Sequence, residues 1–153
     1  MKSDNIKSGL QDLIYRLQDA EKGYLEIAKV SSNAMVSTWL KKYAQERHNM
    51  HGELEMMVLE LGEKPEVETT FLGKLHRMFI DFKINMVSKE NELEAIITEI
   101  ERGASFLIKD YTNVLTNIDM PADMVAKLME HKMIIQRELT SLLELKESLT
   151  KTA

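Results

Sequence analysis

The stretch RLQDAEKGYLEIAKV (residues 16–30) has the pattern of an amphipathic helix, with one charged residue where an apolar one is expected. Glu21 falls on the apolar stripe of this helix, because residues three and four apart share a face. The other members of the stripe are Leu10, Leu13, Ile14, Leu17, Tyr24 and Ala28. A carboxylate in a core is costly unless a metal, a cation or a proton neutralises it, so the partner of Glu21 decides between classes of function.

The composition indicates one helical domain. Of the 153 residues, 44% are hydrophobic and 29% charged, with six glycines and two prolines, which is the balance of a helical protein. A chain of this length buries one sizeable core and is too short to expect two domains. No cysteine is present, which excludes disulfides, thiolate metal sites and thiol nucleophiles.

Charge and hydropathy exclude two classes of partner. The formal net charge of −5 argues against a general nucleic-acid binder, since such proteins cluster Lys and Arg in a basic stripe. No apolar run reaches the roughly 18 residues of a membrane span, and the amphipathic N-terminus lacks the apolar segment of a signal peptide. We therefore expect a cytoplasmic protein that binds neither nucleic acid nor membranes.

Four long segments have apolar residues at helical spacing, and they predict helices over about residues 4–30, 33–61, 89–116 and 120–149. Asn33 and Ser88 suit helix N-caps, and Gly62 followed by Pro65 suits a helix end. Each helix would be about 40 Å long, which is typical of a four-helix bundle.

The connection over residues 63–88 is too long for a tight turn. Apolar residues at helical spacing within it predict a fifth, shorter helix over about residues 68–86. A long crossover lets the second and third long helices lie parallel, as in ferritin-like bundles. The predicted fold is therefore an all-α, ferritin-like four-helix bundle with a short crossover helix. We interpret His76, Arg77 and Asp81 as a polar cluster that docks this helix, with anion or partner binding as the alternative.

Polar residues recur at one depth of the apolar stripes. Arg47 is the central polar residue of the second helix, and Lys132 has the corresponding place on the fourth. Glu101 lies at the boundary of the stripe on the third. We expect a buried ionic layer in which Glu21 pairs with Arg47 and Glu101 pairs with Lys132. Hydroxyl groups would close the remaining hydrogen bonds, and those available belong to Tyr24, Tyr43 and Tyr111.

A di-metal carboxylate site holding iron or manganese is the alternative. In such bundles a Glu from each of two helices and a Glu-x-x-His pair from each of the others converge on two metals. The candidate ligands here are Glu21, Glu46, His51, Glu53, Glu101 and His131. The Glu-x-x-His pairs are defective, since Asn49 and Met133 stand three residues after Glu46 and Glu130. The positive charges of Arg47 and Lys132 also conflict with two metal cations.

Several motifs give the chain a family resemblance. They are DAEKGY (19–24), YAQERHNMHGEL (43–54), LGEKPE (61–66), GKLHRMFIDFK (73–83), IERGASFLIKDY (100–111) and MPAD (120–123). With them the chain resembles, over about residues 8–145, a family of uncharacterised bacterial proteins with a ferritin-like four-helix bundle, treated as a domain of unknown function. The resemblance implies the bundle and the crossover helix, but no established activity. Ala104 and Ser105 stand where such relatives have a Glu-Asp pair, which weakens any transfer of a metal site.

No Ser-His-Asp order, Gly-rich phosphate loop or nucleotide motif occurs. The sequence therefore favours a non-enzymatic binding or assembly protein without a cofactor, kept in register by its buried ionic layer. We expect a homo-oligomer or another protein partner, with Phe106 and Met78 as apolar residues off the core stripes. A ferritin-like di-iron or di-manganese protein, as a metal binder or an oxidase, is the alternative.

Overall fold

The computed structural model describes residues 2–66 and 89–151, which form four long helices and no strand. The helices are α1 (Lys2–Val30), α2 (Ala34–Glu60), α4 (Lys89–Asn117) and α5 (Ala122–Lys151). The prediction of an all-α, four-helix architecture is thereby confirmed. The expected crossover helix over residues 68–86 lies outside the described residues, and so do His76, Arg77 and Asp81.

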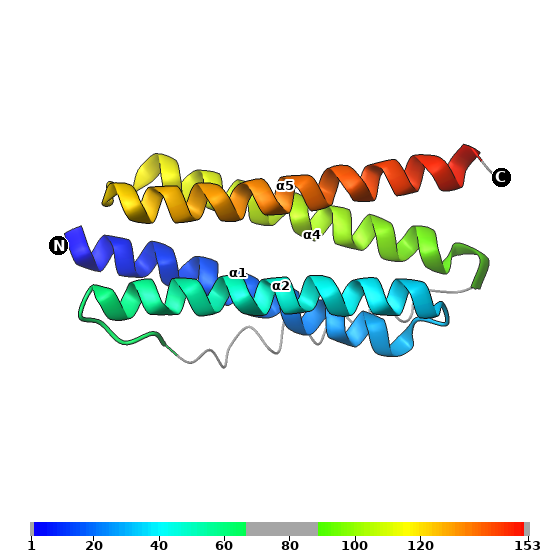
Figure 1. The fold of residues 1–153 in the computed structure, drawn as a ribbon, viewed down its shortest axis with the longest axis horizontal. Coiled ribbons are helices and arrows are strands. Elements are labelled where there is room, and N and C mark those ends of the chain that lie inside the picture. Colours follow the sequence, from blue (N-terminus) through cyan, green and yellow to red (C-terminus); the bar gives the residue numbers. More distant parts are fainter. Residues whose placement is uncertain (1, 67–88, 152–153) are drawn as a thin grey trace.

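The helices form two antiparallel hairpins, α1 with α2 and α4 with α5 (Figure 1). The contact between α1 and α2 is the most extensive, α4 packs on α5, and α1 also contacts α4. Helices α2 and α4 run in the same direction (Figure 1), as expected from the long connection between them.

Local sequence signals fix the ends of α2. The side chain of Asn33 accepts hydrogen bonds from the backbone N–H groups of Met35 and Val36, at 3.0 and 3.2 Å. At the other end, Gly62 has a φ of 79°, a conformation that side chains disfavour. The N–H of Gly62 donates to the Leu59 carbonyl at 2.9 Å, and the N–H of Glu63 donates to that of Val58 at 3.2 Å. These bonds form a Schellman motif, which ends the helix where its glycine predicted.

The buried face of α2 repeats every seven residues, as in coiled coils. Its members are Val36, Leu40, Tyr43, Arg47, Met50, Leu54 and Met57. The same repeat on α5 runs through Met124, Leu128, His131, Ile135, Glu138 and Leu142. The stripe expected on α5 is Val125, Leu128, Lys132, Ile135, Leu139 and Leu143. Leu128 and Ile135 are fully buried as expected, whereas each of the other four lies one residue beyond a member of the observed repeat. Leu143 is 42% exposed, whereas Leu142 is 1% exposed.

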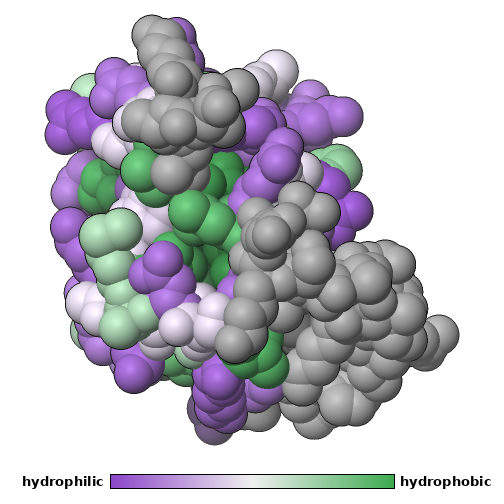
Figure 2. Space-filling view, turned by 90° about the vertical axis from the view of Figure 1, so that its right-hand side faces the viewer, coloured by the Kyte–Doolittle hydropathy of each residue, from purple (hydrophilic) through white to green (hydrophobic). Residues whose placement is uncertain are grey.

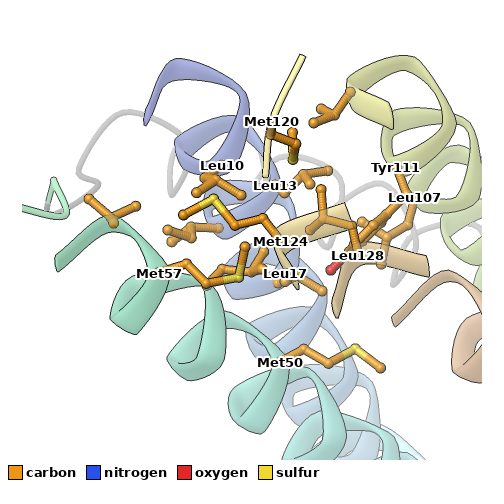
Figure 3. Packing of buried hydrophobic residues seen from close by; sticks show 14 of the residues in the cluster. Leu10, Leu13, Leu17, Met50, Met57, Leu107, Tyr111, Met120, Met124 and Leu128 are labelled. Carbon is orange, nitrogen blue, oxygen red and sulfur yellow. The ribbon is translucent and has the colours of Figure 1, made fainter. Parts of the chain in front are cut away.

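Buried apolar side chains form two clusters along the bundle. The first includes Leu10 and Leu17 of α1, Met57 of α2 and Leu128 of α5, which point toward one another (Figure 3). The second is centred on other residues of the same four helices, among them Tyr24, Leu40, Ile97 and Leu142. Along both α2 and α5, a polar residue separates the two clusters: Arg47 on α2 and Glu138 on α5.

The hairpins are also tied together where α1 ends and α4 begins. The carboxylate of Glu92 accepts hydrogen bonds from the backbone N–H and the hydroxyl of Ser32, at 2.7 and 2.5 Å. Figure 2 looks onto this end of the bundle and shows apolar side chains at its centre with hydrophilic residues around them. None of the helices within the described ranges has a stretch long and apolar enough to span a bilayer.

Candidate functional site

The guanidinium of Arg47 is buried at the level between the two apolar clusters, with 1% of its side chain exposed. Its Nη2 lies 2.5 Å from Oε2 of Glu138, a residue whose side chain is 12% exposed. The ring of Tyr24 lies 5.7 Å from the guanidinium carbon, within the range of a cation–π contact. Arg47 and Glu138, here called the core pair, therefore connect the two hairpins through a buried, charge-assisted hydrogen bond.

The expected buried ion pair exists, but the predicted carboxylate, Glu21, is wrong: Arg47 pairs with Glu138. Glu21 instead contacts His48 and His51. The hydrogen bond from Gln18 to Glu55 sets Glu21 beside the preceding turn of α2, which carries both histidines. Since successive residues of a helix are rotated by about 100°, Arg47 faces α5 while His48 faces α1.

The expected pairing of Glu101 with Lys132 is also wrong. The Oε2 of Glu101 lies 3.2 Å from Nζ of Lys146. The contact between Tyr111 and His131 sets the register of α4 against α5. Glu101 precedes Tyr111 by ten residues, or about 15 Å of helix, so it is too far along α4 to meet Lys132.

The three tyrosines of the expected ionic layer make different contacts. Tyr24 offers its ring to Arg47, and its centroid lies 6.2 Å from that of Tyr43. Tyr43 packs beside Trp39 at 5.0 Å between centroids, and burial raises the pKa of the Tyr43 hydroxyl to about 12. The hydroxyl of Tyr111 forms a hydrogen bond with Nδ1 of His131 at 2.8 Å.

His131, expected at the edge of its helix, is fully buried and joins three helices. Burial lowers the pKa of His131, which keeps the imidazole neutral, and burial raises the pKa of Tyr111, which keeps its hydroxyl protonated. Nε2 faces Oε1 of Glu53 at 3.6 Å, and since a carboxylate only accepts, this favours the tautomer with the proton on Nε2, in which the Tyr111 hydroxyl donates to Nδ1. The contact between Nε2 and Glu53 is too long for a hydrogen bond.

Glu53 is held by a cation from α5. Its Oε2 lies 2.7 Å from Nζ of Lys127. Burial raises the pKa of Glu53, but the hydrogen bond from Lys127 and the nearby His131 outweigh that effect, so the net pKa of the carboxyl is lowered. The same hydrogen bond raises the pKa of Lys127. Glu53 therefore forms an ion pair with Lys127.

A second polar group lies between α1 and α2, here called the edge cluster: Glu21, His48, His51 and Glu55. Nδ1 of His48 lies 2.7 Å from Oε1 of Glu21, and Nε2 of His51 lies 3.4 Å from both oxygens of Glu21. Nδ1 of His51 lies 3.0 Å from Oε1 of Glu55. His48 is largely exposed, with 60% of its side chain accessible, while His51 is buried.

The edge cluster has the donor set of a metal site. Ligand atoms of Glu21, His48 and His51 all lie within 4.8 Å of one another. Of the six alternative ligands named from the sequence, only Glu21 and His51 meet here, and the third member of the group, His48, is not among the six. Three others are occupied differently: Glu53 by Lys127, Glu101 by Lys146 and His131 by Tyr111. Glu46 is half-buried on α2 and takes no part in this group of ligands.

Sequence reasoning missed Glu138 and misplaced His131. Both lie on the seven-residue repeat of α5 that begins at Met124. The expected stripe shares Leu128 and Ile135 with this repeat and has the same seven-residue period. It takes Lys132 and Leu139 where the structure buries His131 and Glu138, because an apolar pattern favours Leu139 over its charged neighbour.

Comparison with known proteins bears on α1, α2 and α4. Among curated proteins, no sequence matches this chain. A family model described as a domain of unknown function, DUF2383, matches residues 5–117. The match includes Arg47 and the edge cluster, while Glu138 and His131 lie beyond it. The chain belongs to the DUF2383 family.

Proposed function

We propose that this chain is a ferritin-like helical bundle of the bacterial cytoplasm that works as a non-enzymatic assembly protein, and that its partner is a second copy of itself. The observation that carries the first part is the core pair, Arg47 with Glu138. A di-metal bundle gathers carboxylates and imidazoles at mid-height and needs them free to bind cations. Here the same level is filled by a guanidinium that already neutralises a carboxylate.

The donor set of the core does not fit two metals. Two of the acidic candidates, Glu53 and Glu101, are paired with Lys127 and Lys146. A divalent cation near Arg47 would be repelled by the guanidinium in a region of low dielectric, where such repulsion is strong. Two carboxylates that a di-iron or di-manganese oxidase would use are thus engaged by lysines, and a guanidinium lies at the level of the metals, which favours assembly over that competing function.

The outer face of α5 supports assembly. Met129 and Met133, both exposed, lie one turn apart beside a shallow depression. The residues that line it are Ala126, Met129, Glu130, Met133, Ile134 and Arg137. Apolar residues in such a position are typical of interaction surfaces, and methionine adapts its shape to a partner.

The charges on this face favour a second copy as the partner. Glu130 precedes Met133 by three residues and Arg137 follows it by four. If two α5 helices cross antiparallel near Met133, a two-fold axis places Glu130 of each copy near Arg137 of the other. The two methionines would then be covered at the centre, with opposite charges at the rim. The surface is thus complementary to itself.

Light scattering coupled to size-exclusion chromatography tests this proposal. The untagged wild-type chain is expected to elute with the mass of a dimer at micromolar concentration. Replacing Met133→Glu puts a charge at the centre of the two-fold contact and is expected to give a monomer with an unchanged circular dichroism spectrum. The matched control is Met56→Glu, on the exposed face of α2, which is expected to leave the dimer intact.

A wild-type chain that is monomeric at every concentration would overturn the choice of partner. So would a Met133→Glu variant that stays dimeric. Charge reversal provides a second check: Glu130→Arg is expected to weaken the dimer, and the double variant Glu130→Arg/Arg137→Glu is expected to restore it.

A further inference from the structure

The edge cluster has no part in the function proposed above, and its chemistry points elsewhere. We propose that Glu21, His48 and His51 bind one divalent transition-metal ion of the zinc class. Two imidazole nitrogens and a carboxylate oxygen are the ligands that such ions prefer. Mg²⁺ and Ca²⁺ select oxygen ligands, so the two histidines disfavour both.

The distances suit a single ion. In a tetrahedral zinc site with metal–ligand bonds of about 2.0–2.1 Å, the ligand atoms lie about 3.3–3.4 Å apart. Nε2 of His51 is 3.4 Å from both oxygens of Glu21. Nδ1 of His48 is 2.7 Å from the nearer oxygen, so it must retreat by roughly 0.6 Å to reach the tetrahedral spacing. His48 is 60% exposed and can make this movement without disturbing the core.

The two helices hold the ligands without rearrangement of the backbone. His48 and His51 are three residues apart, and their rings meet edge to face with centroids 5.0 Å apart. This spacing puts both side chains on one face of α2. Glu21 reaches them from α1, which packs along α2 over its length. The site therefore forms with the hairpin itself.

The hydrogen bonds of His51 leave room for a cation. Its Nδ1 faces Oε1 of Glu55 and its Nε2 faces both oxygens of Glu21. A neutral imidazole has one N–H and satisfies only one of these carboxylates. If Nδ1–H donates to Glu55, the lone pair of Nε2 points at a carboxylate, and the contact becomes favourable when a second proton or a metal ion lies between them.

Glu55 supplies the outer support that metal-binding histidines usually have. A carboxylate that accepts the second ring N–H of a ligand histidine fixes its tautomer and orientation. Glu55 in turn accepts a hydrogen bond from Nε2 of Gln18 at 3.3 Å. His51 is therefore presented with Nε2 free for a metal, while the exposed side of His48 leaves the remaining coordination position open to water.

Zinc titration by isothermal calorimetry tests the site, with untagged, chelator-treated protein and ZnCl₂ as the probe. The wild-type chain is expected to bind one ion per chain. Replacing His48→Ala removes a ligand from the surface without touching the core, and it is expected to weaken binding at least 10-fold. Glu55→Gln keeps all three ligands and loses only the charged support of His51, so it is expected to weaken binding about 10-fold.

Two variants serve as matched controls. Glu26→Gln removes a carboxylate of α1 that pairs with Lys29, and Gln45→Ala removes a polar side chain of α2 that bonds Asn49. Both are expected to bind zinc as the wild type does. The site is disproved if the folded wild-type chain binds no zinc at millimolar concentration. It is equally disproved if His48→Ala binds as tightly as the wild type.

Discussion

Arg47 and His48 are neighbours in the chain and lie in opposite environments. The side chain of Arg47 is 1% exposed and meets Glu138 across the core, while that of His48 is 60% exposed and meets Glu21 at the edge. One helical step of about 100° separates them. The same turn of α2 thus presents a closed ion pair inward and an open group of ligands outward.

The core pair and the edge cluster both join a carboxylate to nitrogen groups, and they differ in how far these groups are buried. In the core, a carboxylate and a guanidinium neutralise each other where water is excluded, so neither is available to an added cation. At the edge, a carboxylate and two imidazoles meet beside solvent, where an ion can enter and keep water as a ligand. We therefore expect the core pair to act on stability and register, and we propose ligand binding for the edge cluster alone.

Removing one partner of the core pair should have the largest effect. Glu138→Leu leaves a buried guanidinium without its carboxylate and is expected to lower the free energy of unfolding by about 3–5 kcal/mol, measured by urea titration. Removing both charges in Arg47→Met/Glu138→Leu is expected to recover most of that loss. A single variant as stable as the wild type would mean that the pair is not closed.

Removing the hydrogen bond between Tyr111 and His131 should have the second-largest effect on the free energy of unfolding. Tyr111→Phe leaves Nδ1 of a buried imidazole without a donor, and it is expected to cost about 1–3 kcal/mol in the same titration. The control is Tyr15→Phe, which removes an exposed hydroxyl that donates to Glu66, with an expected loss below about 0.5 kcal/mol. Equal losses in the free energy of unfolding would mean that the buried hydrogen bond of Tyr111 contributes no more than the exposed one of Tyr15.

His131 should make stability depend on pH. Burial lowers its pKa below the ordinary value of 6.5, so below pH 6.5 the unfolded chain binds a proton more readily than the folded chain does. Stability from this residue is complete above pH 6.5 and falls on acidification by up to about 1.4 kcal/mol per pH unit, until the pH reaches its folded pKa. Urea titrations from pH 8 to 5 should show this loss in the wild type.

The variant Tyr111→Phe/His131→Leu isolates that contribution, because it removes the imidazole and its donor together. The difference in slope between wild type and variant over pH 6.5–5 belongs to His131, and an unchanged slope would contradict its burial in the neutral form. The lowered pKa of Glu53 acts at lower pH: the stability that this carboxyl contributes is present above its ordinary pKa of 4.5 and is lost as the pH falls through the folded pKa.

The smallest effect on the free energy of unfolding is expected for the edge cluster. With a chelator present, Glu21→Gln is expected to change the free energy of unfolding by less than about 1 kcal/mol, since its contact with His48 is exposed to solvent. With zinc at about 100 times its dissociation constant, the wild type should gain about 2.7 kcal/mol and the variant should gain much less. Equal gains in melting temperature would contradict the assignment of Glu21 as a ligand.

Much of the fold was predictable because its signals are local. Asn33 and Gly62 mark the two ends of α2 through backbone hydrogen bonds that depend on nearby residues alone. The long segment before Lys89 indicated that α2 and α4 run in the same direction, as Figure 1 shows. A central polar level containing Arg47 was also visible, because one charged residue interrupts a long apolar stripe.

The partners within that level were not predictable from single helices. From the sequence, carboxylates on more than one helix are candidates for Arg47, and the packing of the helices pairs it with Glu138 while Glu21 contacts His48. On α5, the apolar pattern favours Lys132 and Leu139 beside the shared Leu128 and Ile135, whereas the structure buries His131 and Glu138. The edge cluster depends on the contact of α1 with α2, and His48 showed only its outward position in the sequence.

Anomalous diffraction at the zinc edge from crystals soaked in zinc chloride locates any bound ion without reference to stability. We expect one peak per chain, between Glu21, His48 and His51, and no density for metal between Arg47 and Glu138. A peak at the centre of the bundle with Arg47 displaced from Glu138 would contradict the account. The core would then be the metal site, and the edge cluster would not be.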